Sequence, residues 1–469
     1  MNTTTLPPLS NETAVDASGP AVYDLPVATE HQAQARGWLW LGLLALIGAG
    51  VFSVLLVLAR TPGVNTMLPG VDFFKTALIV HVDLSVLVWF VAIAGVLWSI
   101  NAPLRAVRLG WFALWSAAIG TVMMVLAPFL DPGIPVMANY IPVIESRLFL
   151  SGLVVFGIGG AALVVRACCS IPALNGVLTG VMSLRFGLFA AAVSAAVAVL
   201  AFVWSLVLLP VTLDREVYWE ILFWGGGHAL QYTWTLLLLV GWLWLAQACG
   251  AAVPLSARVT LLLFVVALLP VFVTPYAYLA HDIVSPEHRR LHTLGMRVGG
   301  GLAIFPIAAA VLVALFGLKR IALNARPLRA ALLASMGLFA AGGIIGIAID
   351  GSNVKIPAHY HGCIVGVTLA MMGLVYHLLP RLGYGTPSGR LAVNQSYLYG
   401  LGQLMHIIGL VWSGGYGVQR KVAGTDQVLR SAGEVYGMGL MGLGGLIAII
   451  GGVLFVVVVW RSLRQAPAR

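Results

Sequence analysis

"PAHYHGCIVG", residues 357–366, places two histidines one residue apart at the start of an apolar run that meets no Asp, Glu, Lys or Arg before Arg381. Ionisable side chains are costly in hydrocarbon and are usually functional where they occur there. Positions i and i+2 of a helix lie about 200° apart, so His359 and His361 are predicted to point to opposite sides. This spacing favours two separate cofactors, because a single ion prefers ligands at i, i+3 or i, i+4.

The composition of the whole chain is that of a polytopic membrane protein. Of 469 residues, 60% are hydrophobic and 9% are charged, and the mean hydropathy is +0.98, far outside the range of soluble domains. Runs of about 20 apolar residues, enough to cross a ~30 Å hydrocarbon core, predict twelve transmembrane helices in one all-α domain over residues 37–460. They start near Trp38, Thr76, Leu109, Phe149, Phe186, Tyr218, Val259, Leu291, Leu328, Pro357, Tyr397 and Val435. Residues 1–36 and 461–469 are expected to be tails.

The basic residues predict how the helices are oriented. An even number of spans places both termini on one side of the membrane, and 15 of the 26 lysines and arginines fall on that side. Basic residues favour the cytoplasm, so we expect a protein of the inner (plasma) membrane, surrounded by lipid, with both termini cytoplasmic. The net charge of +10 is then mostly an orientation signal. Nucleic acid is not an expected partner, because no basic face belongs to a soluble fold.

The histidines are predicted to gather at one depth. With this orientation, His81 begins the second helix, His228 lies about three turns into the sixth, and His281 ends the seventh, all in the outer half of the membrane together with His359 and His361. Histidines satisfied separately by hydrogen bonds would have no reason to share a depth, so the pattern indicates cofactor binding. Three further histidines are expected to lie away from this group in core, interface or tail positions: His377, His406 and His31.

Together these motifs resemble the catalytic subunit I of the haem-copper oxidase superfamily, which includes oxygen reductases and nitric oxide reductases. The resemblance covers about residues 37–460 and rests on the twelve helices, "AHYH" (358–361), "HVDLSVLVWF" (81–90), "FWGGGHALQY" (223–232) and "LAHD" (279–282). It implies two haems, expected to be of b type, and one non-haem metal, iron or copper. It also implies that His359 binds the high-spin haem and that His361 and His81 bind the low-spin haem.

The resemblance implies that the non-haem metal is bound by His228 and by a His-His pair at the end of the seventh helix, where this sequence has His281 and Asp282, so we expect His228, His281 and Asp282 to bind it. A carboxylate is a harder ligand than imidazole, so the change favours iron over copper. Two alternatives stay open. Asp282 could cap the helix or orient His281. Alternatively, His288 and His292, an i, i+4 pair, could supply the ligands; otherwise they are expected to be interfacial or to neighbour haem propionates.

The proton route separates the two reactions of the superfamily. Oxygen reductases that conserve energy take protons from the cytoplasm, but the inner halves of helices six and eight, 233–246 and 306–318, contain no acid, Lys or His. All acids of the predicted spans lie in the outer half or at its edge: Asp83, Glu220, Asp282, Asp350 and Glu434. Protons relayed from outside by Glu220 are therefore the simpler inference, unless threonines and waters, or Gln403 and His406, form an inner route.

The sequence therefore predicts an oxidoreductase that reduces nitric oxide to nitrous oxide. Tyr232, one turn after His228, is an oxidase-like feature, so an oxygen reductase is the alternative; a haem-binding membrane protein without turnover is a second alternative. The four cysteines form neither a CxxCH motif nor the ligand set of a two-copper centre. We therefore expect electrons from a partner subunit, either a cytochrome c or a cupredoxin-like protein.

Overall fold

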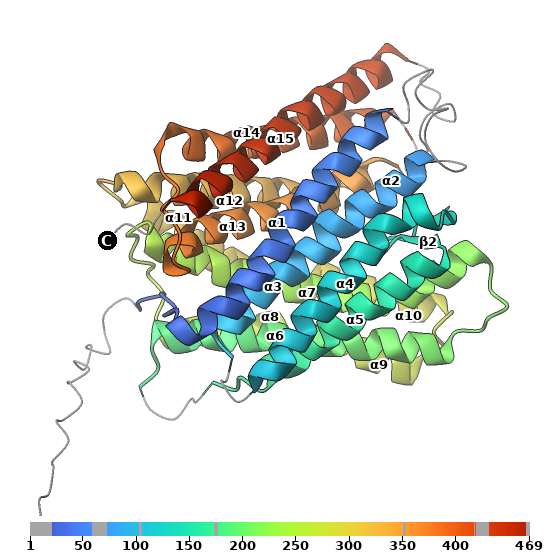
Figure 1. The fold of residues 1–469 in the computed structure, drawn as a ribbon, viewed down its shortest axis with the longest axis horizontal. Coiled ribbons are helices and arrows are strands. Elements are labelled where there is room, and N and C mark those ends of the chain that lie inside the picture. Colours follow the sequence, from blue (N-terminus) through green and yellow to red (C-terminus); the bar gives the residue numbers. More distant parts are fainter. Residues whose placement is uncertain are drawn as a thin grey trace, which may run out of the picture.

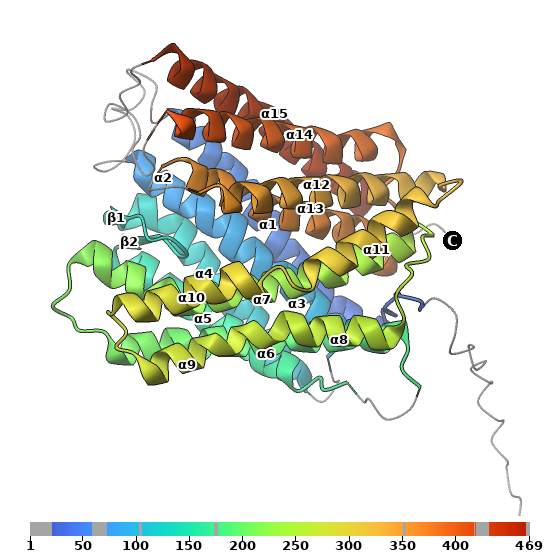
Figure 2. The same ribbon diagram turned by 180° about the vertical axis from the view of Figure 1, so that it is seen from behind.

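In the described part of the chain, twelve helical spans run side by side in one bundle, and several of them are bent; Figures 1 and 2 show the arrangement from opposite sides. The structure is a computed structural model and describes residues 21–58, 73–102, 106–172, 177–349, 353–416, 418 and 431–465. The single-helix spans are α1 (Thr29–Leu58), α4 (Val107–Leu130), α5 (Arg147–Cys168), α6 (Gly180–Leu208), α7 (Arg215–Ala248), α12 (Arg326–Ile347), α13 (Lys355–Arg381), α14 (Gly389–Gly415) and α15 (Ala432–Arg464). A 3-10 turn, Leu323–Ala325, leads into α12.

Three spans are interrupted. A π-helix, Asp83–Val88, joins α2 (Phe73–Val82) to α3 (Trp89–Ile100) directly after His81. A 3-10 turn with Pro270, Leu269–Phe272, separates α8 (Ala257–Leu268) from α9 (Val273–Ala280), because proline cannot donate to the helical ladder. Residues 300–303 separate α10 (Pro286–Gly299) from α11 (Ile304–Phe316). π-Helical turns in α-helices are frequent at functional sites.

The predicted number of spans is confirmed. Within the described residues, eleven spans are long and apolar enough to cross a membrane, and α14, which carries Asn394, Gln395 and Gln403, is the more polar twelfth. Every span begins between two and nine residues before its predicted start, because helical hydrogen bonding continues beyond the hydrocarbon core. The largest difference is at α1, which begins at Thr29, so His31 lies in a helix. Residues 1–20 and 466–469 of the predicted tails, and Asp350, lie outside the described residues.

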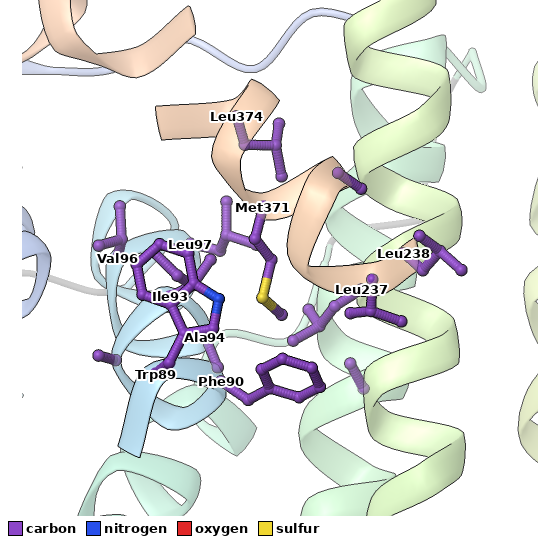
Figure 3. Packing of buried hydrophobic residues seen from close by; sticks show 14 of the residues in the cluster. Trp89, Phe90, Ile93, Ala94, Val96, Leu97, Leu237, Leu238, Met371 and Leu374 are labelled. Atoms are coloured by element: carbon purple, nitrogen blue, oxygen red, sulfur yellow. The ribbon is translucent and has the colours of Figure 1, made fainter. Parts of the chain in front are cut away.

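Two helices, α7 and α13, form the centre of the bundle. In each, 83% of the most apolar segment is buried, whereas the value is 33% for the peripheral α5 and α15. Figure 3 shows Met371 and Leu374 of α13 between Trp89 and Phe90 of α3 on one side and Leu237 of α7 on the other. The sequence motifs with His228, His359 and His361 therefore lie on the helices that are most enclosed by protein.

Glycines bring α12 and α13 into close contact. A Cβ atom on Gly362 would lie 2.5 Å from the Cα atom of Gly342, and one on Gly366 would lie 2.8 Å from Phe339. Small residues let membrane helices approach closely, since lipid provides no hydrophobic drive for their association. This approach brings the carbonyl of Gly342 within reach of side chains on α13.

A short antiparallel hairpin covers one end of α7. It consists of β1 (Ile134–Val136) and β2 (Val143–Glu145), with Pro135 opposite Ile144. Glu145 accepts a hydrogen bond from Trp219 at 2.7 Å and pairs with Arg215 at 2.6 Å, which holds the hairpin on the first turns of α7. The loop between the strands is thereby fixed above His228. The opposite end of the bundle carries both the start of α1 and the end of α15 (Figure 1).

Candidate functional site

Three histidines from two helices meet below the hairpin. His228 lies on α7, and His288 and His292 lie one turn apart on α10. The ring centroids are 5.6 Å apart for His228 and His292 and 4.7 Å apart for His288 and His292. The three residues are 5%, 1% and 3% exposed in chain order, so His288 and His292 are buried in the protein and not interfacial.

Each of these imidazoles uses Nδ1 for a backbone carbonyl. His228 donates to Trp224 O at 2.8 Å, His288 to Ala277 O at 3.3 Å and His292 to His288 O at 2.9 Å. The Nε2 atoms of His288 and His292 are buried and have no hydrogen-bond partner among the described residues. Buried polar atoms are nearly always paired, and metal-binding histidines usually donate their second ring N–H in this way. The donor set therefore fits a metal ion.

The rings are not fully converged on one point. Within the described residues, no three His, Cys, Asp or Glu side chains are close enough to share an ion as they lie. The phenol of Tyr140 occupies part of the space, with its hydroxyl 3.1 Å from Nε2 of His228. Metal binding at this group would therefore require the phenol to give way and the imidazoles to turn slightly.

His281 and Asp282 lie at the turn between α9 and α10. His281 ends α9, and its backbone N–H donates to Ala277 O. Asp282 borders this turn; its carboxylate accepts from Val284 N at 2.9 Å and its carbonyl accepts from Ser285 N at 3.0 Å. Among the described residues, neither side chain has a hydrogen bond or ring contact with His228, His288 or His292, although both lie within electrostatic range of His288. The contacts favour the pair on α10, which the sequence left open as the alternative.

The three glycines of "FWGGGHALQY" make room for aromatic rings around His228. A Cβ atom on Gly225 would collide with Tyr278, one on Gly226 with Phe202, and one on Gly227 with the ring of Tyr140. Tyr278 in turn stacks edge-on against His288, with ring centroids 4.6 Å apart. The glycines thus allow a closely packed aromatic wall to contact the backbone of α7 directly beside the histidines.

Glu220 and the loop that carries Tyr140 lie on the hairpin side of His228. Glu220, one of the predicted site residues, accepts hydrogen bonds from the backbone N–H of Asn139 at 3.1 Å and from its side-chain amide. The next residue, Tyr140, places its hydroxyl 2.9 Å from Nδ1 and 3.1 Å from Nε2 of His228. Burial raises the pKa of the Tyr140 phenol, and the charge of Glu220 adds to this effect. Tyr140 therefore stays protonated and can donate to the imidazole.

Tyr232 is a further polar residue near the three histidines. It is 3% exposed, and its hydroxyl is buried with no hydrogen-bond partner among the described residues. A Cβ atom on Gly295 would lie 3.4 Å from this hydroxyl, which places the phenol against α10 one turn beyond His292. Hydroxyls of buried tyrosines usually find a partner. The unpaired hydroxyl of Tyr232 beside the unpaired Nε2 atoms of His288 and His292 indicates that the space between them takes a polar ligand.

His359 faces the neighbouring helix α12. Its Nδ1 donates to Gly342 O at 2.8 Å, across the close helix contact made by the glycines. A Cβ atom on Gly346 would lie 2.6 Å from the His359 ring, so the absence of a side chain there leaves room for the imidazole. A carbonyl that accepts from Nδ1 fixes the ring as in metal-binding histidines and leaves Nε2 for a ligand.

His361 points to a second group of histidines, on a different side of α13. Its ring centroid lies 5.2 Å from that of His406 on α14. All three imidazoles of this region again donate Nδ1 to a carbonyl: His361 to Pro357 O at 2.8 Å, His406 to Met441 O at 3.0 Å and His81 to Ala49 O at 2.9 Å. The expectation that His406 lies away from the histidines is therefore wrong. Lying nine residues before the end of α14, it reaches the same depth as His361.

The π-helical turn after His81 carries a buried carboxyl group. Asp83 is 1% exposed, and both of its carboxyl oxygens lack a hydrogen-bond partner among the described residues. An unpaired carboxylate is costly in a low-dielectric interior.

The end of the bundle with both termini is closed by the segment before α1. Tyr23 is fully buried and its hydroxyl contacts Leu255 O at 2.9 Å and Thr260 Oγ1 at 2.6 Å. Asp24 accepts hydrogen bonds from Arg381 at 2.7 and 3.0 Å and from Trp244 Nε1 at 2.7 Å. Its contact with His377, and then those with Arg381 and Trp244, hold the pKa of the Asp24 carboxyl well below its usual range.

Sequence reasoning missed Tyr140 and His406 as members of these groups. Tyr140 lies in a loop with no motif of its own, and only the hairpin brings it to His228. His406 was placed too near the start of its helix because the predicted start was eight residues too late. With the correct start, its position in the span would have placed it at the depth of His361.

Comparison with known proteins identifies relatives along most of the chain. Residues 34–458 match the family model of Cytochrome C and Quinol oxidase polypeptide I. An uncharacterized protein of Rickettsia prowazekii is 28% identical, over 93% of this chain and 97% of that protein. An uncharacterized protein of Aquifex aeolicus is 27% identical, over 75% and 86%. The cytochrome c oxidase subunit 1 of Thermus thermophilus is 25% identical, over 82% and 76%.

Proposed function

The chain belongs to the cytochrome c and quinol oxidase polypeptide I family, and from this premise we propose that it catalyses the reduction of nitric oxide: 2 NO + 2 e⁻ + 2 H⁺ give N₂O and H₂O. Membership makes the chain an oxidoreductase of the haem-copper oxidase superfamily and an integral membrane protein. It also counts against the alternative of a haem-binding protein without turnover. What we propose beyond family membership is that the substrate is nitric oxide and which residues bind the cofactors and deliver protons.

The proposed haem ligands are the histidines on either side of α13. His359 would hold the high-spin haem, and His361 and His81 would hold the low-spin haem. The support is that all three donate Nδ1 to a backbone carbonyl and keep Nε2 for iron. His359 faces α12 and His361 faces α14, so one helix would separate two haems and could pass electrons between them.

The proposed ligands of the non-haem metal are His228, His288 and His292. They are supported by their ring contacts and by the two buried, unpaired Nε2 atoms. These three histidines take the place of the predicted set His228, His281 and Asp282. Without the carboxylate there is no reason to prefer iron, since imidazole suits both copper and iron. When bound, the metal and the high-spin haem would supply the redox chemistry that joins two nitrogen atoms and removes one oxygen.

The chain's own part in the reaction is to deliver protons to the gas. Glu220 can take up a proton at the hairpin side and holds Asn139, whose neighbour Tyr140 places its hydroxyl beside His228. At the opposite end, Tyr23 and the Asp24 contacts cover the ends of α7 and α13. The place of Glu220 beside the loop that carries Tyr140 is the observation that carries the proposal, because it puts a proton donor on the side predicted to be outside and needs no inner channel.

One observation favours reduction of oxygen to water as the second candidate. Tyr232 follows His228 by one helical turn and has an unpaired, buried hydroxyl, so it could supply a proton or an electron to bound oxygen. The similarity to a cytochrome c oxidase subunit 1 agrees with this candidate.

Gas consumption by the purified protein tests the proposal. Wild type should reduce nitric oxide, and Glu220→Gln should lower the rate about 100- to 10,000-fold if it is the proton donor, while Tyr232→Phe should leave most of the nitric oxide activity. Faster oxygen than nitric oxide reduction, lost in Tyr232→Phe, would establish the second candidate. The assay should include a cytochrome c and a cupredoxin, because we propose that a partner of one of these kinds donates the electrons.

A further inference from the structure

A basic cavity lies at the end of the bundle that carries both termini. It has a volume of about 610 Å³ and is lined by the loop after α11, the start of α12 and the first turns of α14. Four of its lining residues are cations, Lys319, Arg320, Arg326 and Arg329, and Tyr397 lies beside them. None of these residues takes part in the haem or metal groups described above.

The charge of this cavity, here called the basic pocket, has no counter-charge in the described part of the protein. None of the four cations forms a salt bridge with a residue that the structure describes. The sequence has no Asp or Glu from residue 288 to 349 or from 351 to 425, so α11, α12, α13 and α14 contain none. In addition, Arg329 has a buried Nε atom without a hydrogen-bond partner among the described residues. Such an atom is costly unless a ligand pairs with it.

The surroundings of the basic pocket are apolar and face outward. Phe316 is 75% exposed, Leu323 is 72% exposed, and Leu401, one turn after Tyr397 on α14, is 57% exposed. In an integral membrane protein these side chains face lipid, and a tyrosine at their margin is typical of the membrane interface. A single molecule could therefore place an anionic headgroup in the basic pocket and its acyl chains on the adjoining apolar surface.

We propose that the basic pocket binds the headgroup of an anionic phospholipid. The planar fork of an arginine side chain can donate two parallel hydrogen bonds to a phosphate, and the pocket contains three arginines. Basic pockets between helices on the cytoplasmic side are a known means of lipid recognition. The two acyl chains would lie along the exposed side chains of α14 and α11. The proposal does not depend on which gas the protein reduces.

Two pairs of arginines give a matched test. Arg326→Gln/Arg329→Gln removes two charges from the basic pocket, and Arg461→Gln/Arg464→Gln removes two charges from the end of α15, at the same end of the bundle. Both variants lose the same net charge, so effects on membrane insertion and on general attraction to anionic lipid should be equal. Lys319→Gln/Arg320→Gln removes two charges from the loop of the basic pocket and leaves the helices unchanged. It provides a second test if the Arg326/Arg329 variant does not fold.

The measurement is binding of fluorescent phosphatidylglycerol and, separately, phosphatidylcholine to the purified full-length protein in detergent. We expect wild type and the Arg461/Arg464 variant to prefer phosphatidylglycerol, and both pocket variants to bind it about tenfold more weakly or worse. Equal affinity in pocket and control variants would overturn the proposal and leave the charges as an orientation signal. Displacement of the lipid by inorganic phosphate at the same concentration would also overturn it, because the site would then take the ion alone.

Discussion

At the scale of single residues, the orientation of the imidazoles explains how the protein prepares its sites. Six histidines of the proposed ligand set donate Nδ1 to a backbone carbonyl. The carbonyl fixes the tautomer and leaves Nε2 as the acceptor, so no rearrangement of protons is needed when a metal binds. At His288 and His292, Nε2 is buried and unpaired among the described residues and is costly without a ligand, so these two positions are poor candidates for simple packing residues.

Metal content separates the two ligand sets that the sequence allowed. His292→Ala should lower the non-haem metal per protein at least 10- to 100-fold, because it removes a buried imidazole of the group. Asp282→Asn should leave the metal content unchanged, since the Asp282 carboxylate holds the turn before α10. Metal analysis of both purified variants checks this, with the haem spectrum as a control for folding. Loss of metal in Asp282→Asn alone would return the ligand role to His281 and Asp282.

The histidine group around His361 contains one imidazole more than a low-spin haem requires. We expect His81→Ala to abolish the six-coordinate low-spin spectrum. His406→Phe should retain it and raise the midpoint potential, because a less polar neighbour disfavours the more positive oxidised haem. Absorption spectra and a redox titration measure both effects. If His406→Phe loses the six-coordinate spectrum and His81→Ala keeps it, His406 is the partner of His361.

At the scale of elements, the glycines of α7, α12 and α13 determine how closely other groups reach the histidines. Gly225, Gly226 and Gly227 let three aromatic rings contact the backbone of α7, and Gly342 and Gly362 bring α12 to His359. In water a glycine inside a helix costs up to about 1 kcal/mol relative to alanine. In this bundle the cost is offset by contacts that no larger residue would permit.

Gly227→Ala should displace the ring of Tyr140 and move its hydroxyl away from the metal group at His228. We expect a loss of gas reduction of about tenfold or more, as for a displaced proton donor, with the haem spectrum unchanged. Gly160→Ala on α5 is the matched control, because no atom lies within 4 Å of a Cβ atom there, and its activity should equal that of wild type. Equal activity in both variants would show that Tyr140 is not needed for turnover.

At the scale of the whole molecule, the segment before α1 ties together helices that are far apart in the sequence. Tyr23 reaches Leu255 and Thr260, and Asp24 reaches Trp244 and Arg381. This segment therefore joins the ends of α7, α8 and α13 and closes the bundle at that end.

Asp24→Asn should lower the free energy of unfolding by about 1 kcal/mol at neutral pH, a modest value because the Asp24 side chain is 42% exposed. Since the folded-state pKa of Asp24 lies below its unfolded value, the stabilisation is fully present above about pH 4. It is lost as the pH falls further. Thermal unfolding in detergent at several pH values checks this, with Glu30→Gln, at an exposed position, as the charge control. A pH-independent difference between Asp24→Asn and wild type would contradict the account.

The orientation proposed from the basic residues can be tested with a native thiol. Cys169 is exposed at the end of α5, on the side of both termini. A membrane-impermeant maleimide should label it in inside-out vesicles but not in intact cells, and Cys169→Ser should remove the label. Labelling in intact cells would place the termini outside and reverse the direction of the proton path from Glu220.

The sequence by itself determined the class, the number of spans and most of the histidines. Hydrocarbon imposes a simple rule on composition and length, so twelve apolar runs were enough to predict twelve helices. Because ionisable groups are costly in lipid, His81, His228, His359 and His361 stand out within their apolar runs. Helix ends were less predictable, because helical hydrogen bonds extend into the interface, and the resulting error misplaced His406.

Only the tertiary structure decided which of these residues meet. His288 and His292 join His228 because the chain turns back at Asp282 and lays α10 against α7, and Tyr140 joins them because Glu145 holds the hairpin on α7. The basic pocket likewise unites a loop with a helix more than sixty residues later in the chain. Apolar patterning indicates which side chains avoid water, but it does not distinguish a lipid neighbour from a protein neighbour, because both are apolar. The neighbour of each helix is therefore set by close packing and polar contacts.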